Sequence, residues 1–194
     1  PALRESGIPF GFLVTLSEAN LDDLAWVAEF ALEQGAVLLQ IHPLEQTGRA
    51  SNRSSPDDLI ANAAYLAYLR LDALIGNKIA LQLDLAHREV VRAEPWRVYA
   101  DPLDHTASDA LLAERLDTLV IEDDGTVMPL QYGLPRALAL GSLHSESLHI
   151  LAARWAGGGE GTFRAHCRQV LDRCLADPQA LPAFNWFEAL GRQA

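Results

Sequence analysis

Polar side chains of the kinds that bind metals or transfer protons lie at the ends of three apolar runs in the first half of the chain. His42, Glu45, Asp84 and His87 could together bind a divalent metal, since imidazole and carboxylate groups are ordinary ligands. No recognised ligand spacing joins these residues, so we favour the interpretation that the histidines are hydrogen-bonded at strand ends. The other polar residues at these run ends are Thr15, Ser17, Gln40 and Gln82.

Two further chemical roles are open to the residues that follow the second apolar run. Glu45 and Asp84 could act as a general acid–base pair. Nothing in the sequence fixes their separation, and we favour loop capping or ion pairing with Arg49 or Arg88. The turn Gly48-Arg49 could bind a carboxylate or a phosphate, because glycine permits a tight turn and arginine presents a planar donor. An arginine that ties the loop to Glu45 explains the same turn equally well.

Parallel strands would bring these polar residues together. Apolar runs of strand length at 8–16, 37–41 and 78–85 alternate with helical patterns at 20–35 and 57–75, which predicts parallel strands joined by right-handed crossovers. The continuous apolarity of the first run predicts a strand buried on both faces. The carboxyl ends of parallel strands face the same way, and alternation places Gln40 with His42 on one face and Gln82 with Asp84 on one face.

The pattern changes after His87. Residues 88–103 are expected to be irregular or short and extended, 107–116 to form a short helix, and 119–130 to form a hairpin around an Asp-Gly turn. Helices are expected at 145–155 and 162–175, with a flexible connector of glycines at 157–159 between them. Cys167 and Cys174 would lie about 10.5 Å apart on one helix face at ~1.5 Å per residue. That separation is too long for a disulfide, so both are expected to be buried thiols.

Composition limits the possible partners and compartment. The chain has 194 residues, 49% of them hydrophobic, and a formal net charge of −11. This charge gives no help in binding a nucleic-acid backbone or an anionic membrane, and no apolar run approaches the ~18 residues of a membrane span. We therefore expect neither nucleic acid nor membrane as a partner. Two cysteines make no disulfide framework, which favours a cytoplasmic location.

Two segments resemble a known enzyme family. The segment GIPFGFLVTLSEANLDDLAWVAEFALEQGAVLLQIHPLEQTGRA resembles the second half of the barrel of radical S-adenosylmethionine (radical SAM) enzymes, where a strand, a helix and a strand of the form "lqi.pl...GRa" follow one another. The later segment IEDDGTVMPLQYGLPRALALGSLHSESLHILAARW resembles the hairpin after the barrel in the branch with SPASM or shortened twitch extensions. Together they cover most of residues 8–155.

The resemblance implies an α/β fold in two parts. Residues 1–103 would form the second half of a TIM-like partial (βα) barrel, with about three parallel strands. Residues 104–194 would form a C-terminal extension of a β-hairpin and helices. The chain would then be the C-terminal fragment of an Fe–S oxidoreductase that reductively cleaves S-adenosylmethionine to start radical chemistry on a substrate that the sequence does not identify.

The resemblance also implies that the cofactors belong to the parent protein. Family members hold a 4Fe-4S cluster in a C-x3-C-x2-C loop after the first strand, whereas the first cysteine here is Cys167. Leu130 stands where SPASM members often have a cysteine that binds an auxiliary cluster. We therefore expect no cluster, no metal and no activity in this chain alone, and at best very weak binding of S-adenosylmethionine.

Position in the family pattern suggests roles for individual residues. Thr15 and Ser17 match where the family contacts the ribose or the carboxylate of S-adenosylmethionine. Gln40, His42 and the turn Gly48-Arg49 match positions near the adenine and the substrate. The residues expected to face the substrate are Glu45, Asp84 and His87.

An open half-barrel predicts association. It leaves two sheet edges and an apolar inner face uncovered, which promotes pairing with another chain. The missing N-terminal half of the barrel, or a second copy in a homo-oligomer, would cover them. Two other hypotheses remain open: a small metal-dependent hydrolase or isomerase that uses His42, Glu45, Asp84 and His87, and a non-catalytic α/β protein that associates with itself. Three βα units cannot close an eight-stranded barrel of ~250 residues, which weakens the hydrolase hypothesis.

Overall fold

The computed structural model describes residues 5–44, 58–101 and 111–191, which fall into two compact units. The first unit comprises Pro1–Glu89 with Gln179–Trp186, and the second comprises Val90–Pro178 with Phe187–Ala194. The chain is an α/β protein with a three-stranded parallel sheet and small antiparallel sheets, and the described residues form no closed barrel. The expected boundary between 103 and 104 lies outside the described residues and stays a prediction.

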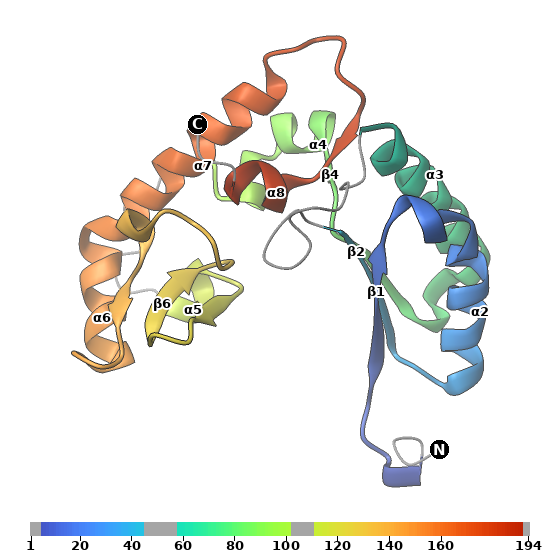
Figure 1. Ribbon diagram of the computed structural model, residues 1–194, viewed down its shortest axis with the longest axis horizontal. Helices are drawn as coiled ribbons and strands as arrows, with labels where there is room; N and C mark the ends of the chain where they lie inside the picture. Colours follow the sequence, from blue (N-terminus) through green and yellow to red (C-terminus); the bar gives the residue numbers. More distant parts are fainter. Residues whose placement is uncertain (1–4, 45–57, 102–110, 192–194) are drawn as a thin grey trace. The chain divides into compact units, whose positions relative to one another are not determined.

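The parallel sheet belongs to the first unit and has the strand order β1-β2-β3 (Figure 1). All three strands run in the same direction, so the alternation of strands and helices in the sequence predicted this sheet correctly. Gly35 ends the helix before β2 in the left-handed conformation, with φ of 74°. The elements are β1 (Gly11–Leu16), η1 (Glu18–Asp23), α2 (Leu24–Gln34), β2 (Leu38–Pro43), α3 (Asp58–Ile75), η3 (Gly76–Lys78) and β3 (Ala80–Leu83).

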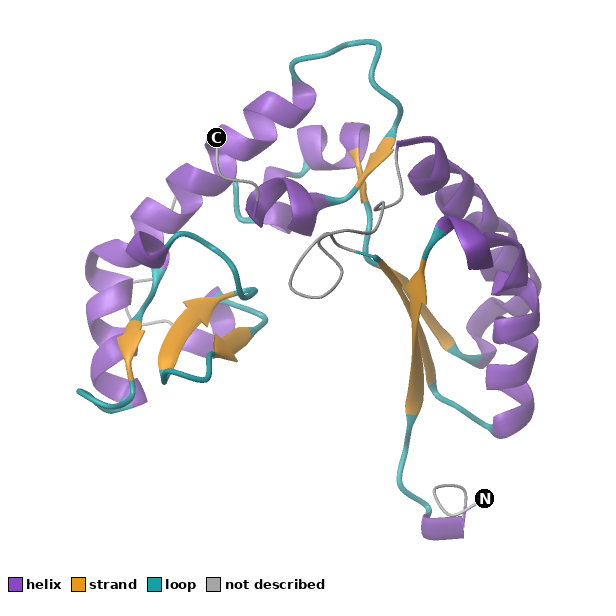
Figure 2. Ribbon diagram, in the orientation of Figure 1, coloured by secondary structure: helices purple, strands orange, loops and turns teal. Residues whose placement is uncertain are grey.

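Helices cover only one face of this sheet (Figure 2). Leu16, Leu39 and Ile41 are fully buried in the core that the sheet shares with α2 and α3. On the opposite face, the Leu13 side chain of β1 is 61% exposed. The expectation that the first strand is buried on both faces is therefore wrong. Its apolar residues alternate between a packed face and an uncovered face, as in a sheet with one helical layer.

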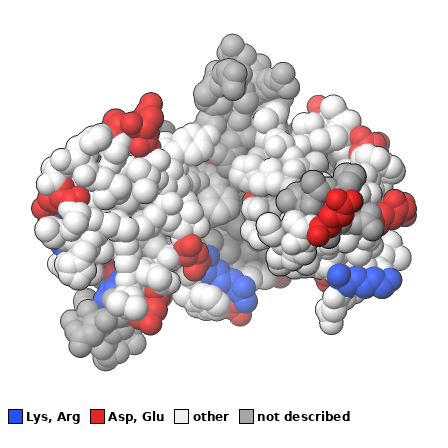
Figure 3. Space-filling view, turned by 90° about the horizontal axis from the view of Figure 1, so that it is seen from below, with Lys and Arg blue, Asp and Glu red and all other residues white. Residues whose placement is uncertain are grey.

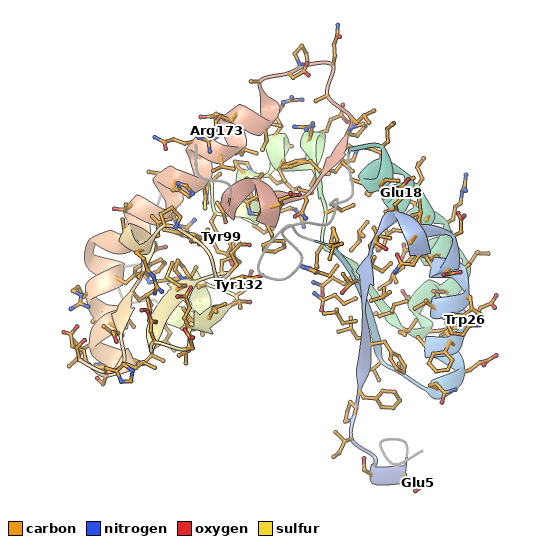
Figure 4. The ribbon with its side chains drawn as sticks, viewed as in Figure 1. Glu5, Glu18, Trp26, Tyr99, Tyr132 and Arg173 are labelled. Carbon is orange, nitrogen blue, oxygen red and sulfur yellow. The ribbon has the colours of Figure 1, made fainter. Side chains whose placement is uncertain are left out.

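Exposed apolar side chains also lie on the helical layer. Trp26 lies on the outer side of α2 and stacks on Phe30, with ring centroids 5.6 Å apart (Figure 4). On α3, Leu59 and Leu74 are exposed. By length and composition alone the segment Leu59–Lys78 could cross a membrane, but the core helix of a soluble protein meets the same criteria.

A short antiparallel pair completes the first unit. Strand β4 (Ala86–His87) pairs with β8 (Ala183–Phe184) from the far end of the chain. The Asn62 side chain on α3 donates to the carbonyl oxygen of Ala183 at 3.1 Å and accepts from its N–H at 3.0 Å. Arg88 Nε donates to the Leu181 carbonyl oxygen at 2.7 Å, and its guanidinium lies 4.7 Å from the centre of the Phe184 ring. The segment Gln179–Trp186 thereby packs onto the unit.

The second unit contains a small antiparallel sheet of order β5-β6-β7 and several helices. Strands β5 and β6 form the hairpin predicted around Asp123-Asp124-Gly125. The expectation of irregular structure at 88–103 is wrong in part, since α4 and η4 are helical. The elements that lie wholly or mostly in this unit are α4 (Arg88–Ala93), η4 (Pro95–Val98), α5 (Leu112–Arg115), β5 (Leu119–Ile121), β6 (Thr126–Pro129), η6 (Arg136–Leu138), β7 (Gly141–Ser142), α6 (Leu148–Arg154), η7 (Trp155–Gly159), α7 (Glu160–Leu175) and α8 (Trp186–Gly191).

The glycines at 157–159 do not form a flexible connector. They lie in one turn of π-helix, η7, which joins α6 to α7 without a break. A Cβ atom on Gly159 would lie 2.5 Å from Cδ1 of Trp155. Trp155 is buried, so glycine is required here because the indole ring packs against the helix backbone. Helical glycine is unfavourable by itself, and this packing is what overrides the local preference.

A buried network of charges joins distant parts of the second unit. Glu160, which begins α7, is 1% exposed. Its carboxylate accepts from Arg115 at 2.6 Å and from Nε of Arg164 at 3.0 Å. Arg164 also donates to Asp101 at 2.6 Å. Each buried charge therefore has a charged partner, as burial of ionised groups requires.

Candidate functional site

A cluster of polar side chains surrounds Asp84 on the uncovered face of the parallel sheet. Asp84 directly follows β3, and its N–H donates to the carbonyl oxygen of Ile41 at 2.9 Å. Oδ2 of Asp84 accepts from Nε2 of Gln40 at 2.7 Å and lies 3.0 Å from Nδ1 of His42. Oδ1 accepts from Nε2 of Gln82 at 2.9 Å. These four residues, Gln40, His42, Gln82 and Asp84, are called the Asp84 cluster below.

The parallel register explains why these four residues meet. Leu13, Gln40 and Gln82 lie opposite one another across the three strands. His42, two residues beyond Gln40, lies opposite Thr15. Since every second residue of a strand points to the same face, Gln40 with His42 and Gln82 with Asp84 share the uncovered face. The sequence predicted that the two residues of each pair share a face. The register of β2 and β3 places the two pairs next to each other.

Hydrogen bonding keeps the Asp84 side chain ionised although it is only 7% exposed. Burial by itself would raise the pKa of Asp84, but hydrogen bonds from His42, Gln40 and Gln82, together with the charge interaction with His42, outweigh burial. The pKa of Asp84 therefore lies below its ordinary value of 3.8. An ionised carboxylate only accepts hydrogen bonds, so Nδ1 of His42 carries the proton that it shares with Asp84.

Replacing Asp84 by asparagine is expected to destabilise the first unit by about 1–3 kcal/mol at neutral pH. The NH₂ group of asparagine would face one of the N–H donors that now point at Oδ1 and Oδ2, and that hydrogen bond would be lost. Because the folded pKa of Asp84 is lowered, its stabilising effect is present above the ordinary carboxyl pKa and is lost as pH falls through the folded value. The difference between the two proteins should therefore shrink in acid. Urea unfolding, followed by hydrogen exchange of β2 peptides, measures it.

Asp72→Asn on α3 is the matched control for this substitution. Asp72 is an exposed carboxylate of the same unit, and surface changes of this kind usually alter stability by less than ~0.5 kcal/mol. An equal effect of the two substitutions at neutral pH, or a gap that widens in acid, would contradict the role given to the Asp84 hydrogen bonds.

Thr15 and Ser17 lie where β1 turns into η1. The Thr15 side chain is exposed beside the Asp84 cluster, in register with His42, and its carbonyl oxygen accepts from Nδ2 of Asn20 at 2.9 Å. The Ser17 N–H donates to Oδ1 of Asn20 at 2.8 Å, and the Ser17 hydroxyl lies 3.3 Å from the same oxygen. Thr15 is thus placed to contribute to the uncovered face, whereas Ser17 organises the turn that ends the strand.

The described residues do not by themselves assemble the metal site that the sequence allowed. His87 lies in β4, where its ring packs against Tyr65 at a centroid distance of 5.2 Å. Nδ1 of His87 is buried and has no hydrogen-bond partner among the described residues. Residues 5–44, 58–101 and 111–191 contain no group of three or more His, Cys, Asp or Glu side chains that could hold a metal ion. Glu45, Gly48 and Arg49 lie outside the described residues.

The cysteines do not fit an iron–sulfur cluster. Such clusters are held by several cysteine thiolates, and this chain has two cysteines, both in the second unit. Burial raises the pKa of the Cys167 thiol to about 12, so this group stays protonated at neutral pH. Cys167 is buried, as predicted, whereas the same prediction for Cys174 is wrong because that residue is only partly buried.

Charged side chains are scattered over the molecule. Figure 3 shows acidic side chains in several separate groups and few basic ones, and the described residues on the face shown form no continuous basic patch. In the second unit Arg136 contacts both Glu122 and Asp124, at 2.7 and 3.0 Å.

Comparisons with known proteins add no assignment. No protein-family model matches the chain, and neither a curated protein nor a solved structure matches it significantly. The strongest structural guide to its function is therefore the Asp84 cluster on the uncovered face of the parallel sheet.

Proposed function

We propose that this chain is the C-terminal part of a radical S-adenosylmethionine Fe–S oxidoreductase, with its parallel sheet as the second half of a partial (βα) barrel. The observation that carries the proposal is the uncovered polar face of the sheet. In (βα) barrels the helices lie outside, and ligands bind at the carboxyl ends of the strands. His42 and Asp84 lie at those ends, and Gln40 lies next to them on the face without helices.

In this proposal the chain supplies one wall of a site and no cluster. Thr15 and Ser17 end the first strand near the ribose or carboxylate of S-adenosylmethionine, and Gln40 and His42 lie near its adenine. Glu45, Gly48 and Arg49, which the structure does not describe, would extend the same wall. The cysteine ligands of the cluster would come from another part of the parent protein, which we propose to be cytoplasmic.

The coding sequence upstream of Pro1 tests the proposal directly. We expect a C-x3-C-x2-C motif in the same reading frame. The protein encoded by the whole frame, purified without oxygen, should contain iron and sulfide and should cleave S-adenosylmethionine after reduction. A start codon immediately before Pro1 would exclude the proposal. Stoichiometric zinc in the purified chain would instead favour a metal-dependent hydrolase, for which the described residues supply only His42 and Asp84 close together.

The chain by itself is expected to form a dimer or a larger oligomer that covers the uncovered face of the sheet. Leu13→Lys places a charge on the part of this face formed by the outer strand β1, where Leu13 is 61% exposed, and should shift the chain toward monomer. Leu74→Lys is the control, because Leu74 is 77% exposed on α3, in the helical layer. Light scattering at micromolar concentration measures both. A clean wild-type monomer, or equal shifts in the two variants, would contradict association through this face.

A further inference from the structure

Asp84 fixes the direction of every side chain around it. An ionised carboxylate has no hydrogen to donate, so the Gln40 and Gln82 side chains must turn their NH₂ groups toward it, as the distances of 2.7 and 2.9 Å indicate. His42 likewise turns its Nδ1–H toward Oδ2. One N–H of each glutamine and the Nδ1–H of His42 are therefore directed at this carboxylate, and each glutamine amide keeps a second N–H.

The carbonyl oxygens of the two glutamine side chains consequently point away from Asp84. Gln40 is partly buried and Gln82 is exposed, and neither Oε1 atom has a hydrogen-bond partner among the described residues. The face thus presents two carbonyl acceptors beside a negative charge. An anionic ligand would meet both the carboxylate and the carbonyl dipoles, whereas a cationic donor would be attracted by both.

Apolar residues continue the same face toward the amino ends of the strands. Leu13 lies opposite Gln40 in register, and the next row consists of Gly11, Leu38 and Ala80. A Cβ atom on Gly11 would lie 2.9 Å from Cβ of Leu38, so glycine keeps this row flat. The face is therefore polar toward the carboxyl ends of the strands and apolar toward their amino ends. A ligand with one polar part and one apolar part would match this order.

We propose that this face binds a small primary amine on an apolar stem. The ammonium group would donate to Oε1 of Gln40 and Oε1 of Gln82, with its charge balanced by Asp84, and the stem would lie over Leu13, Leu38 and Ala80. This inference rests on the proposed function in treating the uncovered face as the substrate wall, and it names the class of substrate. Gln40 and Gln82 are binding residues in it, and Asp84 is the residue that orients them.

Titrations with three probes of one shape test this inference. Butylammonium, butanol and butyrate share the four-carbon stem and differ in the charge of the head group. Binding is followed by the side-chain NH₂ resonances of Gln40 and Gln82 in the ¹⁵N-labelled chain at constant ionic strength. The dissociation constant for butylammonium should be at least tenfold lower than that for butanol. Butyrate should cause no saturable shift. Equal or stronger binding of butanol or butyrate would overturn the proposal.

Two glutamine variants localise the binding without touching the core. Gln82→Leu removes one acceptor, together with the hydrogen bond from Nε2 to Asp84, at an exposed position of the short edge strand β3 and should weaken the binding of butylammonium at least threefold. Gln169→Leu, at an exposed position of α7, should leave it unchanged. Unchanged affinity in Gln82→Leu would overturn the inference. The result is independent of the upstream reading frame, so failure of the amine site and failure of the enzyme assignment are distinguishable.

Discussion

Replacing Glu160 by alanine is expected to lower the free energy of unfolding of the second unit by about 3–5 kcal/mol. Glu160 is 1% exposed and accepts from Arg115 and Arg164 at 2.6 and 3.0 Å. Without it, two largely buried guanidinium groups lose the carboxylate that they share, while Asp101 still pairs with Arg164. Hydrogen exchange of α7 peptides, read as a function of urea, follows this unit separately from the sheet of the first unit.

Glu146→Ala is the matched control for the Glu160 substitution. Glu146 forms an ion pair with Arg154 at 2.5 Å, but these side chains are 31% and 54% exposed. Water replaces the lost partner there, so the expected cost is at most ~1 kcal/mol. If Glu160→Ala cost no more than Glu146→Ala, the buried network would contribute nothing beyond an ordinary surface pair.

Replacing Ile41 by alanine should have a comparable effect on the first unit, about 2–5 kcal/mol. The Ile41 side chain is 0% exposed and belongs to the core beneath the central strand. It separates Gln40 from His42 in the chain, and its carbonyl oxygen accepts the Asp84 N–H at 2.9 Å. The cavity should therefore loosen the Asp84 cluster together with the core. Hydrogen exchange of β2 peptides measures the first effect, and the Gln40 side-chain resonance reports the second.

Two substitutions calibrate this prediction. Ile41→Val removes a single methylene group and should cost only about 0.5–1.5 kcal/mol. Ile121→Ala, at an exposed position of β5, should change stability by less than ~0.5 kcal/mol. A cost for Ile41→Ala no greater than that of Ile121→Ala would show that β2 is not packed as described.

Local patterns predicted the parallel sheet because they act over a few residues. Runs of apolar residues separated by helical periodicity determined the strand and helix order, and alternation determined which polar residues share a face. The prediction that the first strand is buried on both faces was wrong because an apolar run does not indicate which elements cover each face of a strand. Leu13 and Val14 are equally apolar in sequence, yet only Val14 packs against the core.

The charged network and the glycine turn could not be predicted because both depend on partners distant in sequence or on close packing. Glu160 follows three glycines and resembles a residue of a solvated loop, while its partner Arg115 lies 45 positions earlier. Arg164, at i+4, was the one local signal of an ion pair. Gly159 likewise appeared to favour flexibility, whereas the neighbouring Trp155 ring requires the absence of a Cβ atom there.

The hydrogen bonds to Asp84 also have a consequence for how the sheet assembles. Side chains alternate with a period of two, so a slip of one residue between β2 and β3 would turn Gln82 and Asp84 into the apolar core. A buried, unpaired carboxylate would make that misaligned sheet strongly unfavourable. The β3 strand is only four residues long and lies at the sheet edge, where backbone pairing by itself holds alignment weakly. Asp84 therefore favours the observed register of β2 and β3 over a register shifted by one residue while the chain folds.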